Sequence, residues 1–228
     1  MKLVIGNKNY SSWSMRPWVL MKHFGLPFEE VRVRFDSFES DSNFKRTIAT
    51  WSGAGKVPLL VDDDGFVVWD SLAIAETLAE RFPAAALWPR DPHRRARARS
   101  LCAEMHSALG ALRNHFAMNI EARLPEVGAR LLAMEPGLRA DLERLCGLWH
   151  DALADSGGPF LFGDFSIADA FFAPVVMRLN TYAPPLPADI AEYGRRITAS
   201  PAVAAWIADA LAEQDFIAHE ELYRSARD

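Results

Sequence analysis

Two neighbouring segments decide the fold: Lys56-Val57-Pro58-Leu59-Leu60 and, after an acidic turn, Phe66-Val67-Val68-Trp69-Asp70-Ser71-Leu72-Ala73-Ile74. They predict a strand, a tight turn, a second strand and a helix, in that order. Proline lacks a backbone N–H and is tolerated where a strand opens, which is the position of Pro58. The pair Asp70-Ser71 is typical of a helix start.

The same segments predict a site for a small acidic peptide. If the Val57–Pro58 bond is cis, the chain turns sharply and leaves the backbone N–H and C=O of Val57 unpaired. A short extended peptide can pair with such an edge like an added strand. Ser71, at the helix start, offers its hydroxyl beside free N–H groups, which together bind a carboxylate.

Composition and charge favour a globular protein that does not bind polyanions. The 228 residues are 50% hydrophobic and 11% aromatic, enough for one large or two modest cores. A formal net charge of −5 argues against a general binder of nucleic acid or anionic membranes. No apolar stretch has the length of a signal peptide or a membrane span. Because Cys102 and Cys146 lack CxxC spacing, we expect no disulfide framework or cysteine metal site, and we predict a cytoplasmic protein.

Residues 1–82 alternate between strand and helix patterns, whereas residues 93–228 are helical throughout. In the first part we expect strands at 3–5 and 29–35, a helix at 17–24 that begins at Pro17, and a short helix at 41–49. Residues 83–92, rich in proline and alanine, are expected to be the linker. The predicted fold class is therefore a small α/β domain followed by an all-α domain.

The helix near residue 166 has a well-specified start. The segment Phe165-Ser166-Ile167-Ala168-Asp169-Ala170 is a capping box, in which Ser166 caps the helix and Asp169 reaches back to the Ser166 N–H. We interpret this motif as structural rather than catalytic.

With these features in place, the chain resembles the cytosolic glutathione transferases over nearly its whole length. The features that carry the resemblance are Val57-Pro58, Asp70-Ser71-Leu72-Ala73-Ile74, the loop Ser11-Ser12-Trp13-Ser14-Met15-Arg16 and Ser166-Ile167-Ala168-Asp169. The resemblance implies a thioredoxin-like first domain, an all-helical glutathione-transferase second domain that contributes the electrophile site, glutathione as cosubstrate and a homodimer. The serine loop is most similar to that of the zeta class, which includes maleylacetoacetate isomerases. This sequence differs from that class at Trp13, where zeta enzymes have cysteine, and at Asp70, where Glu or Gln is commoner.

Serine hydroxyls are the candidate catalytic groups. A free thiol is mostly protonated at neutral pH, and a hydroxyl that donates a hydrogen bond to the sulfur favours the nucleophilic thiolate. Ser12 and Ser11 both precede the first helix and both fit the position of the family's serine, so sequence does not separate them. In the alternative interpretation the two serines only cap the helix. Tyr10 is a third candidate, since other classes use a tyrosine at the end of the first strand.

The resemblance also implies how glutathione is held. Val57 should exchange backbone hydrogen bonds with the cysteinyl part, and Asp70 and Ser71 should hold the γ-glutamyl end. Lys56 either pairs with the glycyl carboxylate or is simply solvated. The complete set of expected glutathione-binding residues is Lys56, Val57, Pro58, Asp70, Ser71 and Arg16.

The expected electrophile is small and hydrophobic, and its site should lie between the domains. Candidates for an apolar wall are Trp13, Met15, Phe38, His106, Phe116 and Met118, although such residues at helical spacing are more often core. No carboxylate or cysteine stands at ligand spacing from His106, so we expect no metal. A cluster of arginines, interpreted as a solvated face or as a two-fold interface with acidic residues of a second copy, comprises Arg90, Arg94, Arg95, Arg97 and Arg99.

The leading functional hypothesis is a detoxifying transferase or isomerase with a serine-activated glutathione thiolate. Thiol–disulfide exchange is disfavoured, because residues 7–16 contain no cysteine. The alternative from another class is a transferase-like fold kept as a non-catalytic binding or regulatory module.

Overall fold

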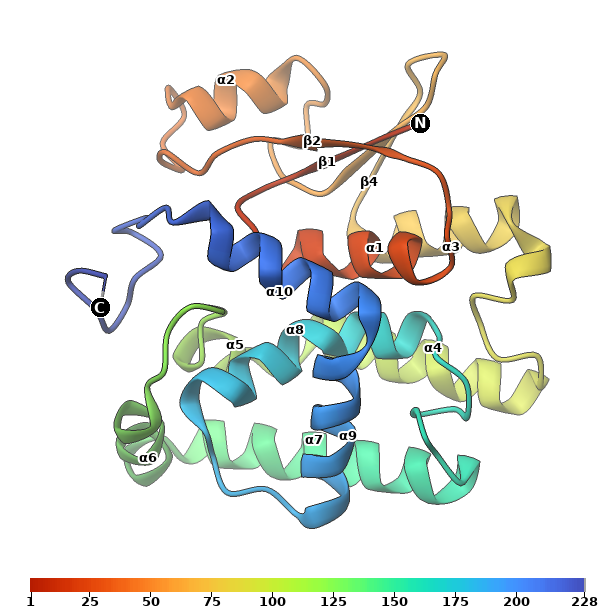
Figure 1. The fold of residues 1–228 in the computed structure, drawn as a ribbon, viewed down its shortest axis with the longest axis vertical. Helices are drawn as coiled ribbons and strands as arrows, with labels where there is room; N and C mark the ends of the chain where they lie inside the picture. The colour runs from red at the N-terminus through yellow and green to blue at the C-terminus, as the bar shows by residue number, and fades with distance from the viewer. Residues whose placement is uncertain (228) are drawn as a thin grey trace.

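A computed structural model describes residues 1–227, which form a sheet domain stacked on a larger helical domain (Figure 1). The sheet has the strand order β2-β1-β3-β4, with β1 and β2 parallel and the other pairs antiparallel. Its strands are β1 (Lys2–Ile5), β2 (Glu29–Arg32), β3 (Leu59–Val61) and β4 (Val67–Trp69). Helices α1 (Ser12–His23) and α3 (Ser71–Arg81) cover the face toward the helical domain, and α2 (Asn43–Ala49) covers the other (Figure 1).

The alternation of side chains along β1 explains why both faces are covered. Leu3 and Ile5 point into the core that contains α1 and α3 and continues into the helical domain. Val4 points to the opposite face, where it packs with Phe44 and Ile48 of α2. Because successive residues of a strand face opposite sides, a strand that is apolar at every position needs a cover on each side.

The second part of the chain is entirely helical. After a short 3-10 turn, η1 (Pro83–Ala85), its helices are α4 (Pro92–Ser107), α5 (Gly110–His115), α6 (Pro125–Met134), α7 (Pro136–Ser156), α8 (Ile167–Tyr182), α9 (Ala188–Ala199) and α10 (Pro201–Glu213). Helix α8 lies at the centre, and all but one of its residues are buried. This is the thioredoxin-like domain followed by an all-helical domain that the sequence predicts.

The capping box at the start of α8 is confirmed. The Ser166 hydroxyl accepts a hydrogen bond from the Ala168 N–H at 3.3 Å, and Asp169 accepts from the Ser166 N–H at 2.9 Å. Asp169 also accepts from the Leu161 N–H at 3.1 Å and from the Tyr193 hydroxyl at 3.1 Å. The carboxylate therefore ties α8 to the preceding loop and to α9, which the box alone does not reveal.

Two helix boundaries differ from the sequence prediction. Helix α1 begins at Ser12 rather than at Pro17, which lies inside the helix. The proline there removes one backbone hydrogen bond, a cost that burial of the helix on both sides offsets. The part predicted to be helical throughout is interrupted between α4 and α5, since the chain breaks at Leu109, whose φ is +53°.

Among residues 1–227, no helix combines the length and apolarity needed to cross a bilayer. Cys102 and Cys146 are both free thiols.

Candidate active site

A cavity of about 750 Å³ lies where the sheet domain meets the helical domain. The sheet domain contributes the serine loop, the segment before β3 and the start of α3. The helical domain contributes side chains from α4, α5, α8 and the segment after α10. The sequence-predicted residues on its wall are Tyr10, Ser11, Ser12, Trp13, Phe38, Lys56, Val57, Pro58, Asp70, Ser71, His106 and Met118.

The segment before β3 offers an unpaired backbone to this cavity. The Val57–Pro58 bond is cis. The ladder between β3 and β4 begins at Leu59, so Val57 lies just outside it. Within residues 1–227, the N–H and C=O of Val57 have no backbone hydrogen-bond partner. This is the open edge that the sequence predicts for an extended peptide.

The start of α3 departs in detail from the prediction. Asp70, not Ser71, caps the helix: its Oδ1 accepts from the N–H groups of Leu72 at 2.8 Å and Ala73 at 3.4 Å. Its second oxygen, Oδ2, lies 3.2 Å from Nε2 of His106 on α4. Sequence reasoning missed this pair, because residues so far apart along the chain carry no local signal of contact. The Ser71 hydroxyl accepts from Arg16 at 3.2 Å.

The two candidate serines differ in their hydrogen bonds. The Ser11 hydroxyl donates to the Ser14 hydroxyl at 2.7 Å, and Ser14 in turn accepts from the Gly6 N–H at 3.1 Å. The Ser12 hydroxyl accepts from Nη2 of Arg178 at 3.0 Å. Neither serine side chain caps α1, since no side-chain capping hydrogen bond forms at this helix start. Ser11 occupies the N-cap position of α1, but capping does not account for the hydrogen bonds that the two hydroxyls make.

Arg178 is the functional candidate that sequence reasoning missed. It projects from the apolar helix α8, and besides Ser12 it donates to the carbonyl oxygens of Arg113 at 3.1 Å and of Phe116. Its Nε is buried without a partner among the described residues, and burial lowers the pKa of the guanidinium to about 10. The signal in the sequence was a single arginine in an otherwise apolar stretch, where a charge needs a specific reason.

Tyr10 is engaged elsewhere. Its hydroxyl donates to Glu221 at 2.7 Å and accepts from the Ile217 N–H at 3.3 Å. Burial, helped by the hydrogen bond to Glu221, raises the pKa of Tyr10 to about 12. A phenol that already donates to a carboxylate is poorly suited to donate to a thiolate as well.

Arg16 lies behind the cavity and not on its wall. Its guanidinium is stacked between the rings of Trp13, at 4.1 Å, and Phe171, at 4.9 Å. Burial, together with the charge of Arg178, lowers its pKa. Arg16 therefore contacts Ser71 and Trp13 from the side away from the cavity. It is not one of the residues that can touch a ligand.

The expected apolar wall is present only in part. Trp13, Phe38, His106 and Met118 line the cavity, with the His106 ring edge-on to Trp13 at 5.0 Å. Met15 and Phe116 are fully buried core residues, which is the interpretation that helical spacing favours. Ionisable side chains on the wall that sequence reasoning did not single out are Lys45, Arg113, Arg178 and Glu220.

The arginine cluster makes several contacts within its own chain. Arg94 pairs with Asp155 at 3.3 Å and Arg99 with Glu76 at 3.1 Å. Arg95 donates to the backbone carbonyls of Pro89 and Arg90. In the described part of the chain, no group of His, Cys, Asp and Glu side chains is arranged to hold a metal ion.

Comparisons with known proteins identify relatives of both domains. A family model described as the N-terminal domain of glutathione S-transferase matches residues 10–81, and one described as its C-terminal domain matches residues 92–209. The chain is 32% identical over 176 residues to a probable maleylacetoacetate isomerase of Caenorhabditis elegans, covering 75% of each protein. It is 33% identical over 184 residues to glutathione S-transferase Z1 of Arabidopsis thaliana, covering 74% of this chain and 75% of that protein. A glutathione transferase homologue from Burkholderia, crystallised with bound glutathione, superposes with a TM-score of 0.67 at 27% identity, covering 92% of this chain and 97% of that one.

Proposed function

Because the chain belongs to the glutathione S-transferase family and is similar to its zeta members, we propose that it binds glutathione in this cavity and uses the thiolate to conjugate or isomerise a small hydrophobic electrophile. Residues 1–82 would bind glutathione, residues 93–228 would supply the electrophile side of the cavity, and residues 83–92 would join them. The functional unit would be a homodimer.

The proposed glutathione pose follows the unpaired groups of the wall. The cysteinyl part would pair with the free backbone of Val57 beside Pro58. The γ-glutamyl carboxylate would lie at the start of α3, near the Ser71 hydroxyl, and the ammonium would face Asp70. Lys56 would approach the glycyl carboxylate. Since His106 already contacts Asp70, the γ-glutamyl ammonium would join or replace that contact.

Among the serines, the proposed thiol activator is Ser12. The single observation that carries this choice is the hydrogen bond from Arg178 to the Ser12 oxygen. Because the oxygen accepts from a cation, the hydroxyl proton is free to point into the cavity and is a stronger donor to sulfur. The proton of Ser11 is directed to Ser14 instead. The Arg178 charge would also favour the anionic sulfur directly.

A glutathione titration that follows the ultraviolet absorbance of the thiolate near neutral pH tests the proposal. Wild-type protein and Ser11→Ala should bind glutathione and show a thiolate signal. Ser12→Ala should bind with similar affinity but lose most of that signal, with a loss of activity of about 10²-fold or more. If wild-type protein binds glutathione without any thiolate signal, the protein is a binding module and not a transferase of this kind.

A further inference from the structure

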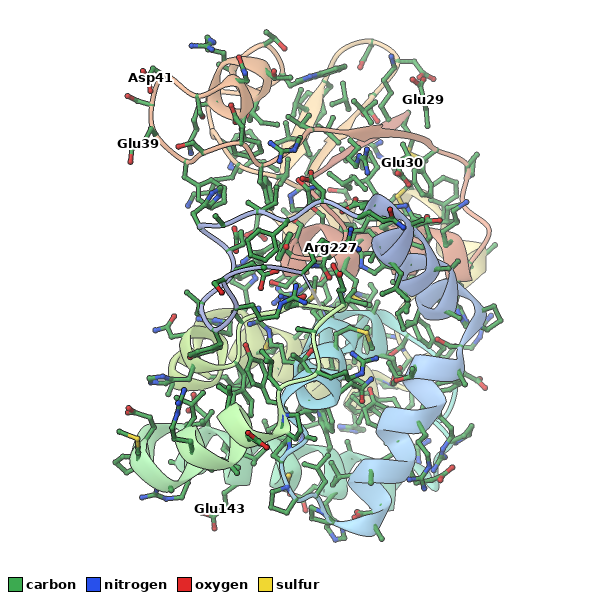
Figure 2. The ribbon with its side chains drawn as sticks, turned by 60° about the vertical axis from the view of Figure 1, so that its left-hand side comes forward. Glu29, Glu30, Glu39, Asp41, Glu143 and Arg227 are labelled. Atoms are coloured by element: carbon green, nitrogen blue, oxygen red, sulfur yellow. The ribbon has the colours of Figure 1, made fainter. Side chains whose placement is uncertain are left out.

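The chain after α10 returns to the level where the two domains meet (Figure 1, Figure 2). This segment brings one side chain, Glu220, to the wall of the same cavity that contains Ser12 and Arg178. The glutathione site proposed above does not require an acidic side chain at this place. Glu220 belongs to the segment that follows the last helix, and it is far in sequence from Val57 and the edge proposed to bind glutathione.

Neighbouring contacts hold the segment in place, so Glu220 is not on a loose tail. The Glu221 carboxylate accepts from the Tyr10 hydroxyl at 2.7 Å and from Nδ2 of Asn119 at 2.8 Å, and it pairs with Arg224 at 2.6 Å. The Tyr223 hydroxyl donates to the carbonyl of His115 at 2.9 Å. These contacts connect the segment to both domains. They fix the backbone immediately after Glu220.

The Glu220 side chain is half-buried, and its carboxyl makes no hydrogen bond or ion pair with another of the described residues 1–227. Burial raises its pKa to about 7; the nearby Arg178 guanidinium opposes this shift and the Glu221 carboxylate adds to it. Both the acid and the carboxylate are then populated near neutral pH, as proton transfer requires. The other ionisable groups on the cavity wall are Tyr10, Lys45, Lys56, Asp70, His106 and Arg113.

We propose that Glu220 is the general acid for additions of glutathione to α,β-unsaturated carbonyl compounds, a role that rests on the function proposed above. The thiolate sulfur forms a bond to the β-carbon of the electrophile, and the electron pair of the C=C bond moves toward the carbonyl oxygen. The resulting enolate takes the proton of the Glu220 carboxylic acid at its α-carbon. The Glu220 carboxylate then regains a proton from water, which balances the proton that the thiol released on ionisation.

The test compares two electrophiles that differ in their need for a proton. Addition to benzylideneacetone consumes a proton, whereas substitution on chlorodinitrobenzene releases chloride and consumes none. The readout is the ratio of the two kcat values in wild type, in Glu220→Gln and in Glu143→Gln. Glu143 is an exposed carboxylate on α7, far from the cavity (Figure 2), and serves as the matched control.

We expect Glu220→Gln to lower the ratio of benzylideneacetone to chlorodinitrobenzene turnover by about tenfold or more, the lower range of acid–base catalysis. In wild type the ratio should fall as pH rises through about 7, and in Glu220→Gln it should not depend on pH. Glu143→Gln should keep the wild-type ratio at every pH. The thiolate signal of bound glutathione should be the same in all three proteins.

An unchanged ratio in Glu220→Gln, or a wild type that does not turn over benzylideneacetone, would overturn the assignment while the thiolate signal still supports the proposed function. An equal loss with both electrophiles would also overturn it, because such a loss indicates a packing role. Absence of the thiolate signal in wild type would instead count against the proposed function itself.

Discussion

At Arg178, one buried cation links the polypeptide around α5 to the Ser12 hydroxyl. Lysine at this position keeps the charge but lacks the planar group that reaches several acceptors at once. We therefore expect Arg178→Lys to raise the apparent pKa of bound glutathione by about one unit, equivalent to ~1.4 kcal/mol. A pH titration of the thiolate absorbance measures this, with Ser11→Ala as control. An unshifted titration in Arg178→Lys would show that the contact with Ser12 does not affect the sulfur.

The capping box alone underestimates the contribution of Asp169 to the free energy of unfolding. From the capping box alone, its loss should cost about 0.5–2 kcal/mol. The structure adds two buried donors, the Leu161 N–H and the Tyr193 hydroxyl, which an alanine would leave without their acceptor. Asp169→Ala should therefore reduce the free energy of unfolding by about 3 kcal/mol, since each unsatisfied buried group costs about 1–3 kcal/mol.

Denaturant titration against Ser166→Ala checks this expectation. The serine variant should lose only about 1 kcal/mol, because the Ser166 side chain takes part in the cap alone. Similar losses in the two variants would mean that the loop and α9 contacts of Asp169 add nothing to stability.

At the scale of elements, the close approach of α6 to the end of α8 depends on Gly128. A Cβ added there would lie 2.0 Å from the backbone oxygen of Tyr182, a contact that backbone must move to relieve. We expect Gly128→Ala to reduce the free energy of unfolding by about 1–3 kcal/mol or more, the usual cost of overpacking. Gly147, exposed on α7 with nothing within 4 Å of an added Cβ, is the matched control. Gly147→Ala should stabilise by up to about 1 kcal/mol in the same thermal or denaturant unfolding experiment. An unchanged free energy of unfolding in Gly128→Ala would show that α6 and α8 can move apart without loss of stability.

Elements could be predicted where a local signal decides them. The order of strands and helices up to α3 follows from alternation, turn residues and the Asp70-Ser71 pair, and all of these act over a few residues. The start of α1 could not be predicted in this way. Pro17 favours a helix start locally, but packing of α1 between the sheet and α8 extends the helix back to Ser12. In this helix, tertiary burial outweighs the local preference.

In the candidate site, residues close together in the sequence could be predicted, whereas residues far apart in the sequence could not. The residues before β3 and at the start of α3 are close in sequence, so one short segment predicts both halves of a peptide site. Arg178 and Glu220 reach the same cavity from α8 and from the segment after α10. No periodicity or motif links them to Ser12, and only the packing of the helical domain on the sheet domain brings them together.

For the molecule as a whole, the docking of the two domains includes a buried cation. The Lys8 ammonium lies 2.8 Å from Glu30 on β2 and 2.5 Å from Asp209 on α10, and 4.4 Å from the Trp18 ring centroid. Figure 2 shows Glu30 on the side of β2 that faces α10, and Glu29 on the other side. Lys8 therefore connects the first domain to the last helix.

The core shared by both domains predicts one cooperative unfolding transition, in which tryptophan fluorescence and far-ultraviolet circular dichroism coincide. Lys8→Met retains the apolar stem but removes the cation from Glu30 and Asp209. Because both carboxylates stay partly exposed to water, the free energy of unfolding should fall by about 1.5–3 kcal/mol, the range for hydrogen bonds to charged groups. Lys2→Met is the control, since Lys2 makes only an exposed pair with Glu29 at 3.7 Å. Its loss should stay below about 1 kcal/mol. Equal losses in Lys8→Met and Lys2→Met would mean that domain docking rests on the apolar core alone. Separate transitions by fluorescence and by circular dichroism would mean that the domains unfold independently.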